Sequence, residues 1–189
     1  MNLLRFLQSI AVFFLIAASC EKTALLAQKI PGYGPNAKAC ALLPISDLET
    51  LYRGKADTPH GFDDESGGSI CSVSIAGALA KVQTAAPGDP GAPHSVQEAF
   101  ALIPMISQDN KGKTKFETKD YGKVGCVKLE LAAAALGDLA KGQKSANAVS
   151  CFLVEKSYLN LTLGSTDAQQ MNFDTVKQLL EKTAARRKN

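Results

Sequence analysis

The C-terminal segment 150–189 constrains the fold most, because its pattern is typical of a β-hairpin followed by a helix. Residues 151–154 are a short β-prone run, 155–157 a polar turn, and 158–163 a return strand. The return strand alternates leucines with polar residues, and this period of two predicts one buried face. Residues 173–184 then carry apolar side chains at helical spacing. A hairpin and a helix with one apolar face each can bury both faces by packing together, so we expect that contact.

Two further helices are predicted by capping-box patterns. Ser46 and Ser95 each stand three residues before a glutamate, and each precedes an apolar run. The first helix is expected to end at Gly54 and the second at about Leu102, before Pro104.

Alternating apolar residues predict two further hairpins, 70–75 with 79–84 and 116–121 with 126–131. Loops are expected at 55–68 and 141–148, with a short helix within 132–140. Hairpins separated by helices indicate an α+β fold: an antiparallel sheet of hairpins covered by helices on one face.

Composition is that of one globular domain: 189 residues, 46% hydrophobic and 21% charged. The formal charge of +3 is too small to indicate nucleic-acid binding. The basic cluster 186–188 suits the C-terminal end of a helix, where cations favour the helix dipole. The absence of Trp argues against stacking platforms for single-stranded nucleic acid. We therefore expect no nucleic-acid partner.

The N-terminus has the features of an export signal. Arg5 precedes an apolar run, 6–18, which is shorter than the roughly twenty residues of a membrane span and ends in small residues. We expect a signal peptide at 1–19. Cys20 follows, so residues 17–20 resemble the lipobox of bacterial lipoproteins, although Ala17 stands where leucine is usual. Ala17 and Ser19 also suit ordinary signal peptidase, so a soluble secreted or periplasmic product is the alternative to a lipid anchor on Cys20, and an uncleaved anchor is the third and least favoured option.

Cysteine arithmetic favours lipidation. The five cysteines are Cys20, Cys40, Cys71, Cys126 and Cys151. If Cys20 carries lipid, the other four can form two disulfides in an oxidising compartment. Three pairings are open; Cys40–Cys71 and Cys126–Cys151 are favoured because each joins neighbouring elements. A zinc site is the weaker alternative, since the cysteines are widely spaced. The expected organisation is a tether at 20–38 followed by a single domain at 39–189.

Several motifs together carry a family resemblance. They are the signal with Cys20, the run Ala-Cys-Ala-Leu-Leu at 39–43 before a helix, Cys71 on the first strand, and Leu-Gly-Asp-Leu-Ala at 136–140. In these the chain resembles small bacterial envelope lipoproteins, a group that includes actinobacterial proteins of unknown function and the extracellular sensor domain of a mycobacterial serine/threonine kinase. The resemblance implies two disulfides, a helix-covered antiparallel sheet related to PsbP-like folds, and no assigned activity.

Catalytic motifs are absent from the sequence. His60 and His94 lie in loops rich in Pro and Gly, and neither G-x-S-x-G nor H-E-x-x-H occurs. The one cluster that could hold a divalent cation is His60 with Asp63, Asp64 and Glu65. Its spacing is not that of an EF-hand, so a solvated loop is the favoured interpretation.

These observations predict a non-catalytic exported lipoprotein of the cell envelope. We expect it to bind a small ligand or an envelope protein, on its sheet or in a pocket between sheet and helices, without a cofactor. A secreted hydrolase or enzyme inhibitor with an unfamiliar active site is the alternative, and a structural envelope role is a third.

Overall fold

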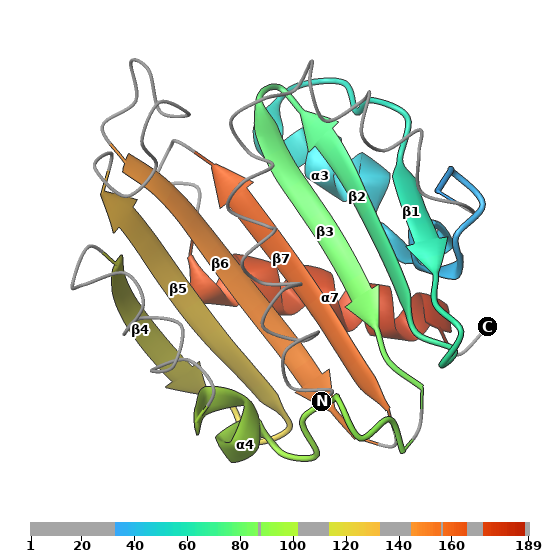
Figure 1. Cartoon of the computed structure of the whole chain (residues 1–189). Helices are drawn as coiled ribbons and strands as arrows, with labels where there is room; N and C mark the ends of the chain where they lie inside the picture. Colours follow the sequence, from blue (N-terminus) through green and yellow to red (C-terminus); the bar gives the residue numbers. More distant parts are fainter. Residues whose placement is uncertain are drawn as a thin grey trace.

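The protein folds around one antiparallel sheet of seven strands, in the order β1-β2-β3-β7-β6-β5-β4 (Figure 1). The computed structural model describes residues 33–86, 88–101, 114–132, 145–155, 157–165 and 172–187. The strands are β1 His60–Asp63, β2 Ser69–Ile75, β3 Ala78–Thr84, β4 Thr114–Asp120, β5 Val124–Ala132, β6 Ser145–Val154 and β7 Tyr158–Ser165. The helices are the 3-10 helix η1 Lys38–Leu42 and the α-helices α3 Ile45–Tyr52, α4 Val96–Ala101 and α7 Phe173–Arg187. The α+β class predicted from the sequence is confirmed.

All three predicted hairpins are present: β2 with β3, β4 with β5, and β6 with β7. The β2–β3 turn consists of Ala76 and Gly77, both with positive φ, as a two-residue type I′ turn requires.

Two segments predicted as loops contain strand. Within 55–68 lies β1, which pairs with β2 although its sequence does not alternate. A Cβ on Gly61 would lie 2.0 Å from the carbonyl oxygen of Ile70, so glycine permits the close approach here. Within 141–148, β6 already begins at Ser145, because it extends along the whole length of β5.

The capping box predicted at Ser46 does not form, whereas the one predicted at Ser95 does. Helix α3 begins at Ile45 without a side-chain cap, and Glu49 instead accepts a hydrogen bond from the Ala56 N–H at 3.0 Å. At α4, the Ser95 hydroxyl oxygen accepts a hydrogen bond from the Glu98 N–H at 3.0 Å. The Glu98 carboxylate in turn accepts one from the His94 N–H at 2.7 Å.

The main core lies between the sheet and helices α3 and α7, which Figure 1 shows together behind the sheet. Leu159, Leu161 and Leu163 of β7 are fully buried here, as their alternation predicts. Val176 and Leu180 of α7 pack against this face. Each fully buried leucine of this kind contributes about 1.5–3 kcal/mol through the hydrophobic effect.

Helix α4 packs on the opposite face of the sheet. The ring of Phe152, which alternates with the core residue Cys151, meets the ring of Phe100 edge-on at 5.5 Å. Gly125 makes this contact possible, because a Cβ there would lie 2.6 Å from the Phe152 ring and 2.7 Å from Val96. The expectation that helices lie on one face only is therefore not met by α4.

Both favoured cysteine pairs lie at disulfide distance. Cys40–Cys71 joins η1 to β2 with Cα atoms 5.0 Å apart. Cys126–Cys151 joins directly opposite positions of β5 and β6, with Cα atoms 4.1 Å apart. These links close loops with sequence separations of 31 and 25 residues.

Several predictions lie outside the described residues: the signal 1–19, Cys20, most of the tether, and the short helix expected within 132–140. The last tether residues, 33–38, contact the fold, since Gly34 forms an isolated bridge with Gly61 of β1. No helix in the described part of the chain is long and apolar enough to cross a membrane.

Removing the β5–β6 link should destabilise the domain. In Cys126→Ala/Cys151→Ala, we expect the free energy of unfolding to fall by about 2–5 kcal/mol, because the unfolded chain loses a constraint. Urea unfolding followed by circular dichroism measures this. Cys20→Ala is the control and should leave the free energy of unfolding unchanged. Peptide mapping that finds Cys40 linked to Cys126 would contradict the pairing.

Candidate functional site

A row of polar residues crosses the second face of the sheet, the face opposite α3 and α7. Lys81 of β3 pairs with Ser72 of β2 on one side and with Thr162 of β7 on the other. Thr162 in turn pairs with Ser150 of β6. Each of the four alternates along its strand with a residue of the main core, so all four lie on the second face.

The row is joined to Asn160 by hydrogen bonds. The Asn160 side-chain amide donates to the Ser150 hydroxyl at 2.6 Å and to the Cys151 carbonyl at 3.2 Å. The Thr162 hydroxyl donates to the Asn160 carbonyl oxygen at 2.9 Å and lies 2.9 Å from the Ser150 hydroxyl. These contacts fix the orientation of the three side chains, which we call, together with Lys81, the polar cluster.

The polar cluster is buried. Lys81, Asn160 and Thr162 are 8%, 6% and 9% exposed, while Ser150 is half-buried. Burial disfavours the charged ammonium and lowers the pKa of Lys81 to about 8. A sheet face built for stability alone carries apolar side chains at such positions, because burying a lysine costs free energy.

Sequence reasoning missed this cluster. The alternation in β7 placed Asn160 and Thr162 on a face that was expected to meet solvent, and Lys81 was given no role. The polar residues occupy matching positions of four neighbouring strands, and this match can be recognised only when the strand order is known.

The cluster has the chemistry of a binding site. Lys81, the register neighbour of Thr162, offers charged hydrogen-bond donors to an anion, while Asn160, Thr162 and Ser150 bond to one another. Within the described chain, the Ser150 hydroxyl bonds to Asn160 and Thr162 rather than to a histidine or carboxylate that could act as a base.

The predicted cation cluster does not converge. Asp63 accepts a hydrogen bond from the Lys38 N–H at 3.0 Å, and a hydrogen bond with Ser69 is the main cause that lowers its pKa. Asp64 closes its own turn, accepting from the Ser66 hydroxyl and the Gly68 N–H, each at 2.7 Å.

His60 and Glu65, the other two residues of the predicted cation cluster, do not complete a metal site either. The ring of His60 stacks on the ring of Tyr33 at 5.8 Å, and Glu65 is exposed. No group of three metal-ligating side chains occurs among the residues that the structure describes. His94, the second histidine, lies apart from them at the start of α4, as an exposed residue.

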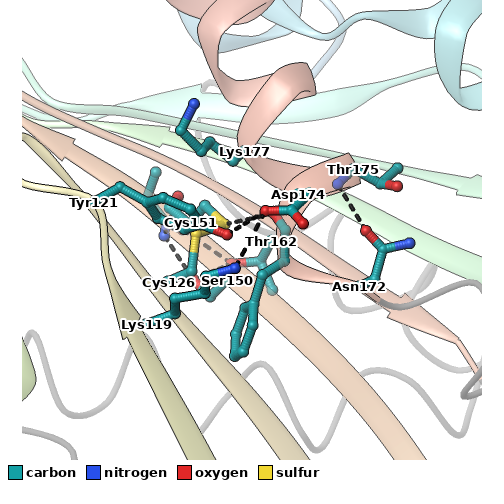
Figure 2. The surroundings of a disulfide bond; sticks show 12 residues. Lys119, Tyr121, Cys126, Ser150, Cys151, Thr162, Asn172, Asp174, Thr175 and Lys177 are labelled. Atoms are coloured by element: carbon teal, nitrogen blue, oxygen red, sulfur yellow. Dashed lines mark hydrogen bonds and ion pairs between the residues drawn. A yellow bond between two sulfur atoms is a disulfide. The ribbon is translucent and has the colours of Figure 1, made fainter.

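A second polar group ties the first turn of α7 to the β4–β5 hairpin, beside the Cys126–Cys151 disulfide. Figure 2 shows Tyr121, Lys119 and Lys177 around Asp174. The Tyr121 hydroxyl donates to Asp174 at 2.5 Å, and the Lys119 ammonium lies 3.4 Å from the same oxygen.

These contacts shift the titration of the group without creating a buried site. The Tyr121 hydrogen bond, followed by the charge of Lys119, lowers the pKa of Asp174. Both lysine ammonium groups lie near the face of the Tyr121 ring, at 4.8 and 5.4 Å from its centre. Because Lys119 and Asp174 are exposed, the group fixes the helix position rather than forming an enclosed pocket.

An open groove of ≈ 370 Å³ lies between α3 and α7, where Asp47 and Lys182 form an ion pair. Arg186, from the basic cluster expected to be a solvated helix end, donates to the Leu43 carbonyl at 2.6 Å. The groove lies between two helices rather than between helices and sheet, and its charges neutralise each other.

Comparison with known proteins finds no matching family model, no matching curated protein and no matching solved structure. The resemblance to envelope lipoproteins therefore stays a prediction.

Lys81→Met should stabilise the fold in a pH-dependent way. Because the pKa of Lys81 falls from 10.5 to about 8 on folding, its buried charge destabilises the wild type below pH 8. We expect the variant to gain about 1–3 kcal/mol in the free energy of unfolding at pH 7. The gain should decline from pH 8 and vanish above about pH 10.5, where the lysine is neutral in both states.

Urea unfolding of both proteins at several pH values measures this difference. Burial raises the pKa of Tyr52 and Tyr158, so both proteins should lose stability above pH 10, and only their difference isolates Lys81. A difference that does not depend on pH would contradict the buried charge.

Proposed function

We propose that this protein is an exported, lipid-anchored binding domain of the cell envelope that holds a small organic anion on the second face of its sheet. The observation that carries the proposal is Lys81, a lysine 8% exposed that lies opposite Thr162 at one side of the hydrogen-bonded polar side chains. An anion bound there would receive a charge-assisted hydrogen bond from the ammonium group.

The neighbours of Lys81 favour an oxygen-rich anion such as a carboxylate or phosphate. The Lys81 ammonium supplies the charge and the donors, and the side chains of Ser150, Thr162 and Asn160, which bond to one another, make this part of the sheet face polar. Ser72 and Gln83 border the cluster and are half-buried, so a ligand approaching along the sheet would contact them first.

The two cysteine pairs at disulfide distance support export, since disulfides persist in oxidising compartments. The sequence adds the signal at 1–19 and a modifiable Cys20. Binding without turnover is proposed because the described hydroxyls of the cluster bond to one another and not to a catalytic base.

Anion binding can be tested with a panel of small carboxylates and phosphate esters at pH 7. We expect at least one member to raise the melting temperature of the wild type, with affinity then measured by calorimetry. Lys81→Met should weaken that compound at least tenfold, because a hydrogen bond to a charged group is worth about 1.5–3 kcal/mol.

Lys128→Met is the matched control, because Lys128 lies on β5 opposite Val149 and so belongs to the other face of the sheet. Its affinity should equal that of the wild type. Equal weakening in both variants, or no stabilising compound in the panel, would contradict the proposal. Consumption of a panel member by the wild type would favour the hydrolase alternative.

Lipidation is tested by growing expressing cells with an alkyne fatty acid. We expect the protein to incorporate the label, and Cys20→Ala to abolish it, because the proposed acyl chain is attached to that sulfur. Cys40→Ala serves as a control that removes a different cysteine. Equal labelling of Cys20→Ala and the wild type, or no labelling of either, would contradict the anchor.

A further inference from the structure

The two edges of the sheet differ in how they are protected. Strand β1 has four residues, and its Gly61 is paired on the outer side by Gly34. Strand β4 has seven residues and lies at the opposite edge (Figure 1), where the described residues pair it on one side only, with β5. An unpaired edge strand of this length is a template for another strand.

The direction of the free backbone groups of β4 follows from the hairpin. The Tyr121 N–H donates to the Val124 carbonyl at 2.8 Å, which makes these two residues a hydrogen-bonded pair. Hydrogen-bonded and non-hydrogen-bonded pairs alternate along an antiparallel ladder. The odd-numbered residues of β4 therefore direct their backbone N–H and C=O groups toward β5. Phe116 and Thr118 therefore aim their N–H and C=O groups at the open edge.

Phe116 is exposed at this edge. It is 43% exposed and is the one exposed large hydrophobic residue in the described chain. Its register partner Leu129 pairs in turn with Ala148, so Phe116 lies on the second face of the sheet, like the polar cluster.

Charges of opposite sign flank Phe116 on the other face. Lys115 and Glu117 are both exposed, and the side chain of neither forms a hydrogen bond or ion pair within the described chain, although the register places them opposite Glu130 and Lys128 of β5. Lys119, by contrast, is engaged by Asp174 and Tyr121.

We propose that β4 pairs antiparallel with β4 of a second copy of this chain, in the register centred on Phe116. In that register the two Phe116 residues lie opposite each other and exchange their outward N–H and C=O groups. Lys115 of each copy lies opposite Glu117 of the other, so one contact contains two ion pairs. Aromatic and opposite-charge cross-strand pairs are both favourable.

Neighbouring registers fit less well. Centring on Glu117 places the two Glu117 carboxylates opposite each other and Lys115 opposite Lys119, which is repulsive. Centring on Thr118 places Phe116 opposite Asp120 and makes Glu117 compete with Asp174 for Lys119. The charge pattern of β4 therefore selects the Phe116-centred register.

The dimer joins both sheets into one continuous sheet. Because residues opposite each other lie on the same face, the polar clusters of the two copies lie on the same side of the joined sheet. A contact of one strand per copy belongs to the small class of interfaces, so the association should be weak and concentration-dependent.

Sedimentation velocity of the full chain over a wide concentration range tests the proposal. The wild type should change from monomer to dimer as concentration rises. Lys115→Glu and Glu117→Lys should each weaken dimerisation about tenfold, because each turns both ion pairs into like-charge pairs. The double swap Lys115→Glu/Glu117→Lys should restore the wild-type affinity.

Lys55→Glu is the control, since it makes the same charge change at an exposed residue outside β4 and should not alter dimerisation. Circular dichroism checks that every variant is folded. A wild type that stays monomeric, a double swap that stays weak, or a Lys115→Glu variant that dimerises more tightly would each overturn the proposal. None of these variants alters the polar cluster, so the result is independent of anion binding.

Discussion

Strand β7 lies at the centre of the sheet, between β3 and β6, and the rest of the structure depends on how its two faces are satisfied. On one face, Leu159, Leu161 and Leu163 supply fully buried apolar surface, and α7 covers it. On the other face, Asn160 and Thr162 are buried as well, and they can be so only because they hydrogen-bond to each other and to Ser150. At β7 the sheet is therefore apolar on the face that α7 covers and polar on the second face, while farther along the second face Phe152 packs against α4.

The two cysteine pairs lie on either side of this strand, and Cys151 is the direct register partner of its Leu161. Cys40–Cys71 holds η1 against β2, and Cys126–Cys151 holds β5 to β6. The Tyr121–Asp174 hydrogen bond then fixes the first turn of α7 next to the second pair (Figure 2). The main core thus contains covalent links between its own residues and is bordered by the polar contact of Tyr121 with Asp174. The stability of the sheet comes from the main core, so the polar cluster on the second face does not have to stabilise the fold.

The sequence predicted those elements whose pattern is local. Period two in 158–163 and helical spacing in 173–184 specify β7 and α7, because each pattern is produced by one element burying one face. The sequence did not predict β1, whose only large apolar residue is Phe62 and whose formation depends on pairing with β2. The capping pattern at Ser46 failed because the helix begins at Ile45, directly after Pro44, before the serine can act as a cap.

The polar cluster could not be predicted for a related reason. Lys81, Ser150 and Thr162 lie far apart in the sequence and become neighbours only through strand order and register. Taken singly, a lysine, serine or threonine in a strand is the type of residue that usually faces solvent. Only the disulfide pairing, which follows from joining adjacent elements, gave correct long-range information, and it concerns the other face of the sheet.

The anion-binding proposal depends on the buried lysine on the second face of the sheet, Lys81. Carbon-13 NMR of labelled lysine side chains, with Lys81 assigned from the Lys81→Met spectrum, measures its titration directly. We expect a midpoint near pH 8 in the free protein. A midpoint at 10.5, the ordinary value for lysine, would show a solvated side chain and contradict the burial of Lys81.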